Sequence, residues 1–406
     1  MKKVGIVLTI FMALLALACG FGGVTVALDI TQPASHSSVM VPFEIVSGDT
    51  TNSVAQRLQN DGLIRNAVLF RLWARYKHLD TGIEPGVYEL SASMTMDAII
   101  QKIQQGKPDE QLVVVPDALR VTQYPDHFTN LKDFNAQNFM KIVQTGQFAD
   151  GTQVSATYWY VLPKQKDAAY ALEGYLYPDS YYFSAGATEK DVLVRMLNAL
   201  GEHLCPGPDA AHLDAYILNQ AQCKAHATTV GNVNVFTALE KTYHTNNDAQ
   251  ALYQALTLAS LATKEILSYK DAPGVAAVYF NRISYFEGWR QDDAGTAGYL
   301  GSDPSAEYAR DTDHPPSNGH WWADLADAGN KIDCGSAYNT ESGCHKGPPP
   351  GPIAAPTWVV IEAAIAPPNT PNFYFVSDKC SRIHYWTNAN DFAAQNAAAQ
   401  ADHQGC

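Results

Sequence analysis

The sequence predicts an α+β protein made of an N-terminal transmembrane helix, a small α/β subdomain and a larger mixed α+β domain. The chain has 406 residues, which is enough for two or three modest domains with a sizeable core. Hydrophobic residues make up 46% of the chain and charged residues 17%, as is typical of globular proteins. Segments with strand-like alternation are interspersed with segments of helical period, and this mixture favours the α+β class.

The charge of the chain limits the classes of partner that it can bind. Its formal net charge is −14 at pH 7. Nothing in such a chain neutralises phosphates in bulk, so we expect no binding to nucleic acid. The negative charge fits instead a protein outside the cytoplasm that mutual repulsion keeps soluble.

The N-terminal segment has the length and composition of a membrane anchor. Two lysines precede the uncharged run Val4–Leu28, and a spanning helix needs roughly 20 apolar residues. By the positive-inside rule, the lysines place the N-terminus in the cytoplasm. We therefore expect residues 1–30 to be a single-pass anchor in the cell (inner) membrane, with the rest of the chain on the extracytoplasmic, periplasmic side. Two alternatives remain open, since Ala16–Ala18 resembles a signal cleavage site and Cys19 a lipidated cysteine.

Six cysteines follow this segment, an even number that suggests disulfides in an oxidising compartment. The short separations favour Cys205–Cys223 and Cys334–Cys344, which leaves Cys380–Cys406 as the third pair. The alternative is a zinc site, because three histidines lie near cysteines. Since no C-x-x-C or H-x-x-x-H spacing supports zinc, we predict no bound metal.

After a Pro/Ser-rich linker at 31–41, residues 42–108 have the pattern of a small subdomain. Its predicted order is strand, helix, helix, strand, helix. The strands are Pro42–Val46 and Gly86–Leu90, helical spacing recurs from Val54 to Leu63 and from Leu69 to Tyr76, and the last helix is Met96–Ile103.

Residues 111–400 form the predicted main domain. Its expected elements are a strand at Gln111–Pro116, a helix from the capping residue Thr188 to Leu200, helices at Ala251–Leu267 and Ala272–Ile283, and strands at Phe373–Val376 and His384–Thr387. Residues 204–245 have an irregular pattern. Residues 292–346 are loop-rich, and His314–Trp322 within them has the character of an insertion.

Glu265 is the candidate catalytic residue on the first helix of the later pair. At about 100° per residue, one apolar arc contains Leu252, Ala255, Leu256, Ala259, Ala262, Ile266 and Leu267, and Gln254, Thr257, Ser260 and Lys264 lie mostly opposite. Glu265 falls on the boundary of the arc, where partial desolvation raises the pKa of a carboxyl. A general acid at neutral pH needs such a raised pKa. The alternative is an ordinary glutamate that forms a salt bridge with Lys264 or Lys270.

A second informative stretch, Leu172–Tyr181 (LEGYLYPDSY), combines a carboxylate, tyrosines and a Pro-Asp turn. With Asp303-Pro304-Ser305, Tyr338-Asn339-Thr340 and Gly347–Ile353 (GPPPGPI), it resembles the endolytic murein transglycosylase (YceG-like) family. The motifs occur in order, and with the anchor and the subdomain they extend the resemblance to nearly the whole chain. The chain departs from the family pattern at Thr263, where the family has a glutamate, and at Asp117-Ala118, where it has Glu-Gly. It also departs at Ser180, Pro348 and Ala355, where the family has Thr, Leu and Asn.

The resemblance implies that Glu265 is the catalytic acid and base of an endolytic lytic transglycosylase. Such an enzyme cuts nascent peptidoglycan strands between N-acetylmuramic acid and N-acetylglucosamine. One carboxyl suffices, because the muramic acid's own C6 hydroxyl attacks and leaves a 1,6-anhydro end. Tethered attack of this kind has effective molarities on the order of 10⁵ M or more. No cofactor is implied. The resemblance also makes residues 42–108 LysM-like, either a module that grips glycan or a spacer.

The same motifs supply the predicted substrate-binding residues of a glycan-binding cleft. They are Glu173, Tyr177, Asp179, Tyr181, Asn281, Asp303, Tyr338, Asn339, Thr340 and Gly351. Rigid Pro-Gly corners present backbone amides, as amide-rich glycans require. Two of these residues have structural alternatives, since Asp179 could cap a turn and Asn281 could anchor a loop.

The partners implied are peptidoglycan glycan strands, the membrane, and peptidoglycan synthases (penicillin-binding proteins) close to it. Two other functions remain open. The first is a catalytically silent glycan-binding scaffold, which the loss of the family glutamate at Thr263 suggests. The second is a hydrolytic muramidase, which would use Glu173 or Asp303 as its second carboxylate.

Overall fold

The computed structural model describes residues 32–401 except 36, 46–48, 78–82, 84–85, 105–109, 185, 207–218 and 326–333. The chain divides into two compact units, of which the first runs to Val113 and includes Asn130–Asp133 and Tyr181–Ala187. The remaining residues belong to the second unit. The predicted anchor at 1–30 lies outside the described residues. Within the described part of the chain, no helix is both long and apolar enough to cross a membrane.

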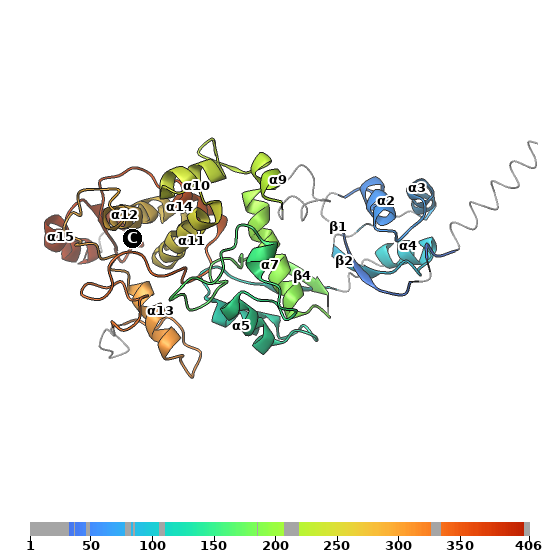
Figure 1. The fold of residues 1–406 in the computed structure, drawn as a ribbon, viewed down its shortest axis with the longest axis horizontal. Coiled ribbons are helices and arrows are strands. Elements are labelled where there is room, and N and C mark those ends of the chain that lie inside the picture. Colours follow the sequence, from blue (N-terminus) through green and yellow to red (C-terminus); the bar gives the residue numbers. More distant parts are fainter. Residues whose placement is uncertain are drawn as a thin grey trace, which may run out of the picture. The chain divides into compact units, whose positions relative to one another are not determined.

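The first unit contains the predicted strand–helix–helix–strand–helix order. Its elements are β1 (Val41–Ile45), α2 (Thr51–Asn60), α3 (Ala67–Tyr76), β2 (Gly86–Leu90) and α4 (Met96–Gln104). β1 pairs with β2 in antiparallel register, with Phe43 opposite Tyr88, and Figure 1 shows the three helices around this pair. The side chains of Thr50 and Asn66 cap the starts of α2 and α3, which explains where both helices begin.

The second unit is mostly helical and carries small two-stranded sheets. Its helices are η2 (Val121–Phe128), α5 (Ala136–Thr145), α6 (Val154–Thr157), α7 (Glu189–Leu204), α9 (Gln220–Ala225), α10 (Val235–Tyr243), α11 (Asp248–Glu265), η4 (Tyr269–Asp271), α12 (Ala272–Phe286), α13 (Asp303–Asp313), α14 (Trp358–Ile365) and α15 (Ala389–Ala401). β5 (Thr229–Val230) pairs with β6 (Val233–Asn234), and β7 (Tyr374–Ser377) pairs with β8 (Ile383–Trp386), both antiparallel. β3 (Glu110–Val114) and β4 (Ser180–Ser184) form another pair, and most of their residues belong to the first unit. The predicted α+β class is therefore confirmed.

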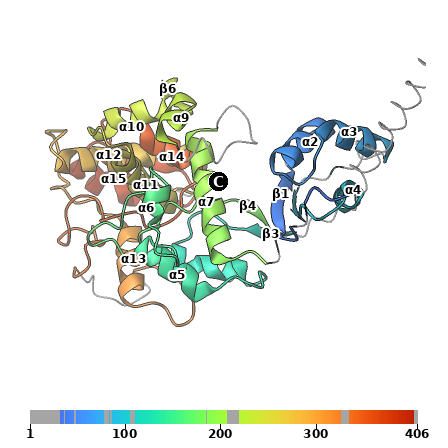
Figure 2. The same ribbon diagram turned by 45° about the vertical axis from the view of Figure 1, so that its right-hand side comes forward.

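Helix α11 is the central element of the second unit. It packs against α10, α12, α13 and α14, and Figures 1 and 2 show α10, α12 and α14 gathered around it. The predicted polar face is wrong, because Thr257 and Ser260 are 4% and 0% exposed. Their hydroxyls donate to carbonyls of α11 itself, at Tyr253 and Thr257, which satisfies them without water. A helix covered on all sides needs no solvent-facing stripe.

Helix α11 ends at Glu265, two residues earlier than predicted. Ile266 has extended backbone angles, and Leu267, predicted to lie on the buried arc, is 64% exposed. α12 begins with Pro273 in its first turn, as proline's fixed φ favours, and continues to Phe286 rather than to Ile283. Glu265 thus stands at the carboxyl end of a helix that the core encloses.

Two of the predicted disulfides are confirmed. Cys205 is bonded to Cys223 and Cys334 to Cys344. Their four sulfurs are therefore not available as the ligands that the alternative zinc site would need. The third predicted pair, Cys380–Cys406, extends outside the described residues.

The two regions that lacked a clear sequence pattern contain regular elements. Residues 204–245 include α9, β5, β6 and α10, and residues 292–346 include α13. The start of α13 has a local signal, since Pro304 occupies its first turn after Asp303. The Thr188 capping box is confirmed with Asp191 as its partner, and α7 extends to Leu204 rather than Leu200.

Candidate active site

Glu265 is the last residue of α11 and points its carboxyl at α12. Tyr279 on α12 donates a hydrogen bond from its hydroxyl to Glu265 Oε1 at 2.7 Å. Burial raises the pKa of Glu265 to about 7, against the Tyr279 hydrogen bond, which lowers it. The unpaired carbonyls at a helix carboxyl end also disfavour a negative charge there. The residue remains partly exposed, so it combines a raised pKa with access from outside.

Tyr279 is a fixed donor to this carboxyl. Its side chain is fully buried, and its ring packs edge-on against Phe375 with centroids 5.7 Å apart. Burial raises the pKa of the Tyr279 hydroxyl well above its usual range, so the hydroxyl keeps its proton. Tyr279 therefore orients Glu265 without exchanging a proton with it.

Two further carboxyls, from Asp303 and Glu341, lie near Glu265. Asp303 opens α13, and Glu341 follows the Tyr338–Thr340 motif in the loop closed by the Cys334–Cys344 disulfide. Burial, followed by the charge of Asp303 and a hydrogen bond with it, raises the pKa of Glu341 to about 7. The negative charges of Asp303 and Glu341 both raise the pKa of Glu265. The sequence motifs pointed to Asp303 but not to Glu341, whose only signal is its place directly after Thr340.

The buried guanidinium of Arg282 is the positive charge of this group. Its Nε donates to the Phe373 carbonyl at 2.7 Å, and a second nitrogen donates to the Leu300 carbonyl. Its charge lowers the pKa of both Glu265 and Glu341. Arg282 thus joins α12 to the segments before β7 and before α13, and it limits how far burial can raise the two pKa values.

Hydrogen bonds explain why the Tyr338–Thr340 motif lies beside α13. The Thr340 and Ser305 hydroxyls are 2.6 Å apart, and the Gly301 N–H donates to the Thr340 carbonyl at 2.9 Å. The Asn339 side chain accepts from the Glu341 N–H at 3.1 Å. Thr340 and Asn339 are 0% and 2% exposed. In this structure they therefore hold the loop that carries Glu341 to Asp303.

Lys264, next to Glu265 in the sequence, has its own set of neighbours. Lys264 Nζ lies 3.9 Å from the centroid of the Trp322 ring and 3.5 Å from the Ala118 carbonyl oxygen. Burial lowers the pKa of Lys264. Glu307, one turn after Asp303 on α13, has its pKa raised to about 7 by burial, and the charge of Lys264 opposes that shift. No sequence motif indicates Glu307 or Trp322 as site residues, and no spacing rule connects them with Lys264.

Glu173 lies in an inner layer rather than at the surface. It is 1% exposed, its Oε1 accepts from the Val121 N–H at 3.0 Å, and its Oε2 accepts from the Tyr308 hydroxyl at 2.8 Å. Burial raises the pKa of Glu173 to about 8, and the charge of Arg120 opposes that shift. The Tyr338 ring, 3% exposed, packs 4.8 Å from the Tyr308 ring. In this structure both predicted residues are enclosed by protein.

Asn281 and Gly351 also make internal contacts. The Asn281 amide donates to the carbonyls of Thr370 and Asn372, at 3.0 and 2.7 Å, and its oxygen accepts from Arg290 at 3.0 Å. This arrangement corresponds to the loop-anchoring alternative. A Cβ at Gly351 would lie 2.1 Å from the Tyr253 hydroxyl, so only glycine fits there.

The motif at 172–181 separates into three environments. Tyr177 accepts from the Trp358 N–H at 3.2 Å, and its ring lies 4.4 Å from that of His203, which in turn stacks on Trp358. Asp179 is exposed at the end of the same turn. Tyr181 is a buried residue of β4 and belongs to the first unit. The structure therefore brings Asp303 together with Glu265 in the second unit, whereas Tyr181 is a residue of the first unit.

Known proteins resemble this chain over most of its length. The sequence profile of the YceG-like family matches residues 43–400. An endolytic murein transglycosylase of Streptococcus pneumoniae is 26% identical, over 96% of this chain and 63% of its own length. One of Bacillus subtilis is 23% identical, over 84% of this chain and 79% of its own length. A crystal structure of a YceG-like protein from Listeria monocytogenes has a TM-score of 0.49 and 22% identity, covering 88% of this chain and 99% of that one. The chain thus spans less than two thirds of the pneumococcal relative.

Proposed function

This chain belongs to the YceG-like family, and we propose that it is an endolytic lytic transglycosylase of peptidoglycan. Its substrate is the glycosidic bond between N-acetylmuramic acid and N-acetylglucosamine within a glycan strand. The observation that carries the proposal is Glu265, a partly exposed residue whose carboxyl has a pKa raised to about 7 and one oxygen held by Tyr279. The relatives from Streptococcus pneumoniae and Bacillus subtilis are both named endolytic murein transglycosylases, which supports the same reaction.

The proposed reaction needs a single proton carrier. Protonated Glu265 donates its proton to the glycosidic oxygen as the bond to C1 of the muramic acid breaks. The C6 hydroxyl oxygen of the same sugar bonds to C1, and its proton passes to the Glu265 carboxylate. The products are a 1,6-anhydro-N-acetylmuramic acid end and a free hydroxyl on N-acetylglucosamine, and no water is consumed. Tyr279 fixes Oε1, so Oε2 is the oxygen that we assign to proton transfer.

The neighbouring carboxyls suit the positive charge that develops on the sugar ring. Asp303 and Glu341 come from two further segments of the chain and present negative charge beside Glu265. Preorganised negative charge stabilises an oxocarbenium-like transition state more than bulk solvent does. Glu173 is less suited to act as a second carboxylate, since both of its oxygens already accept hydrogen bonds inside the protein.

We also propose the location that the sequence favours. Residues 1–30 anchor the chain in the cell membrane, residues 42–108 form a LysM-like unit, and the second unit acts on nascent strands near the peptidoglycan synthases. The two disulfides of the second unit support an oxidising, extracytoplasmic setting.

Digestion of purified sacculi tests the proposal. The protein is expected to release muropeptides with anhydro ends, and mass spectrometry distinguishes these from reducing ends by the mass of one water. Reducing ends would indicate a hydrolytic muramidase instead. Retained binding without any release would indicate a scaffold.

A further inference from the structure

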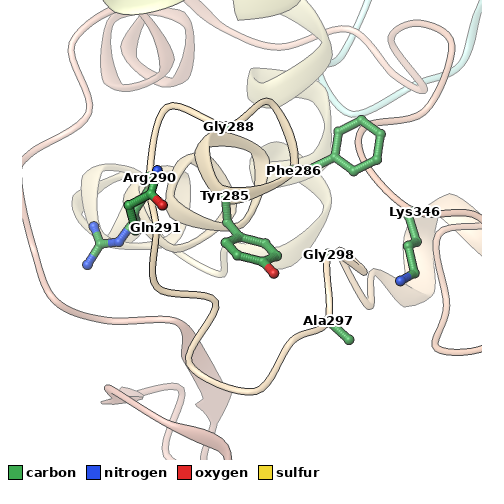
Figure 3. Close-up of a pocket in the computed structure, with 8 residues that line it drawn as sticks. All are labelled: Tyr285, Phe286, Gly288, Arg290, Gln291, Ala297, Gly298 and Lys346. Carbon is green, nitrogen blue, oxygen red and sulfur yellow. The ribbon is translucent and has the colours of Figure 1, made fainter.

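An open cavity of about 410 Å³ lies at the carboxyl end of α12, on the second unit. Figure 3 shows the Tyr285 ring in the middle, with Arg290 and Gln291 on one side and Lys346 on the other. The cavity is lined by Tyr285, Phe286, Gly288, Arg290, Gln291, Ala297, Gly298 and Lys346. Its lining thus combines two cations, two aromatic rings and no carboxylate, although the chain as a whole carries a net charge of −14.

Both cations are held in place by the protein. Arg290 donates to the Asn281 side-chain oxygen at 3.0 Å, and its guanidinium carbon lies 4.7 Å from the Phe373 ring centroid. Lys346 Nζ lies 5.1 Å from the Tyr299 ring centroid. Because neighbouring groups already restrict these side chains, they lose less conformational freedom when a ligand binds.

The acidic residues nearest to the lining in the sequence are Glu287, Asp292 and Asp293, and none of them lines the cavity. Glu287 is exposed to solvent. Asp292 accepts from the Ala294 N–H, and Asp293 accepts from the N–H groups of Gly295 and Ala297, at 2.9 to 3.0 Å. Both carboxylates therefore stabilise the backbone of the loop that follows α12. The lining therefore contains the cations Arg290 and Lys346 and no carboxylate.

Covalent and hydrogen-bonded connections join the cavity to the Glu265 site. Tyr279 and Tyr285 are six residues apart on α12, which corresponds to about 9 Å along the helix axis. The Gly347 N–H donates to the Gly298 carbonyl at 2.8 Å, and the Gly301 N–H donates to the Thr340 carbonyl at 2.9 Å. The segments 298–303 and 341–347 therefore run from the cavity to Asp303 and Glu341. The cavity and the Glu265 site are thus joined by α12 and by these two short segments of the second unit.

We infer that this cavity binds the carboxylate-bearing peptide that substitutes the muramic acid next to the cleaved bond. The inference rests on the proposed function, since it assumes a peptidoglycan strand at Glu265. A neutral sugar has no charge to match two cations, whereas a peptide carboxylate pairs with a guanidinium through two hydrogen bonds and with an ammonium through charge. The rings of Tyr285 and Phe286 provide apolar contact for the peptide's carbon atoms. An anionic phosphate polymer fits less well, because it requires a row of cations rather than one small cavity.

The test compares glycan strands that carry their peptides with strands stripped of them by an amidase. The full-length protein, its Lys346→Gln variant and its Arg290→Gln variant are assayed on both in detergent solution. We expect the ratio of kcat/KM on peptide-bearing strands to kcat/KM on stripped strands to fall about tenfold in each variant, as for loss of one charged hydrogen bond. Lys164→Gln, which neutralises an exposed lysine elsewhere on the second unit, controls for net charge and keeps the wild-type ratio.

An unchanged ratio in Lys346→Gln would overturn the inference, whatever Arg290→Gln does to folding through its bond with Asn281. Competition by polyphosphate at concentrations where a free dicarboxylate tripeptide does not compete would also overturn it, in favour of a phosphate polymer. If the wild-type protein cleaves neither kind of strand, the proposed function itself fails. That outcome is distinct from a wild-type protein that cleaves both kinds equally well, which refutes only the peptide site.

Discussion

Two glutamates of the second unit have similar chemistry but different surroundings. Burial raises the pKa of both, to about 7 for Glu265 and to about 8 for Glu173. Each accepts a hydrogen bond from a buried tyrosine, Tyr279 at 2.7 Å and Tyr308 at 2.8 Å. Glu173 is 1% exposed and both of its oxygens accept hydrogen bonds, whereas Glu265 is partly exposed at a helix end. A raised pKa therefore does not identify a catalytic acid by itself, and the exposure of the residue separates the two.

The largest expected difference is in catalysis. Glu265→Gln removes the acid that protonates the leaving oxygen and the base that accepts the C6 hydroxyl proton, so kcat should fall by about 10³-fold or more. The melting temperature should stay close to that of the wild type, because glutamine resembles the protonated carboxyl. Muropeptide release and thermal unfolding measure the two effects. A variant with full activity would remove Glu265 from the mechanism.

The matched change at Glu173 should act on stability instead. The folded chain keeps the Glu173 proton up to about pH 8, while the unfolded chain, with a pKa of 4.5, has released it. Wild-type stability therefore falls as the pH rises from about 5 to 8, by at most about 1.4 kcal/mol per pH unit through this residue. Glu173→Gln lacks this titration, so its free energy of unfolding should fall less over that window. Urea unfolding at pH 5 and pH 8 measures the difference, and identical pH dependences would contradict it.

The tyrosine donors allow a smaller test of the same contrast. Tyr279→Phe removes a hydrogen bond that lowers the pKa of Glu265. That pKa should rise by roughly one unit, for a bond of about 1.4 kcal/mol. Because the acid must be protonated, the alkaline limb of the pH–rate profile should move to higher pH. Tyr308→Phe removes the equivalent donor to Glu173 and should leave that limb in place. A shift of equal size in both variants would mean that the two carboxyls are coupled.

The smallest effect is expected in the backbone beside the site. Ala118, whose carbonyl faces Lys264, has a φ of 59°. This left-handed conformation raises the free energy of any residue that has a Cβ. Ala118→Gly should stabilise the protein by about 0.5–1 kcal/mol with kcat unchanged. A gain in stability together with a loss of activity would show that the strained turn serves the reaction rather than the fold.

Local features of this structure were predictable from the sequence. The element order of the first unit, the bounds of β2 and the Thr188 capping box depend on contacts within a few residues, which periodicity and capping rules describe. The two disulfides join cysteines that are 18 and 10 residues apart. Spacing favours such pairs, because their members lie close together in the sequence. The helical period of the apolar residues also predicted the position of Glu265 at the edge of the apolar arc.

The surroundings of Glu265 could not be predicted in the same way. Glu341 reaches the site through the Thr340–Ser305 contact, between residues 35 positions apart, and Glu307 lies on a helix that the polar sequence of 303–313 did not reveal. The same long-range packing explains the error on α11. Thr257 and Ser260 are buried because four helices cover α11, a fact about tertiary neighbours that the helix's own residues do not contain.

The enclosure of α11 has a consequence for how such a protein can diversify. Glu265 is attached to the element whose amide hydrogens should exchange most slowly with solvent, so the acid's position is difficult to change without losing the core. Asp303 and Glu341 come instead from a helix start and a loop, where substitutions are better tolerated. Directed evolution toward other strand chemistries is therefore expected to succeed through changes in 298–303 and 334–347, with α11 left intact.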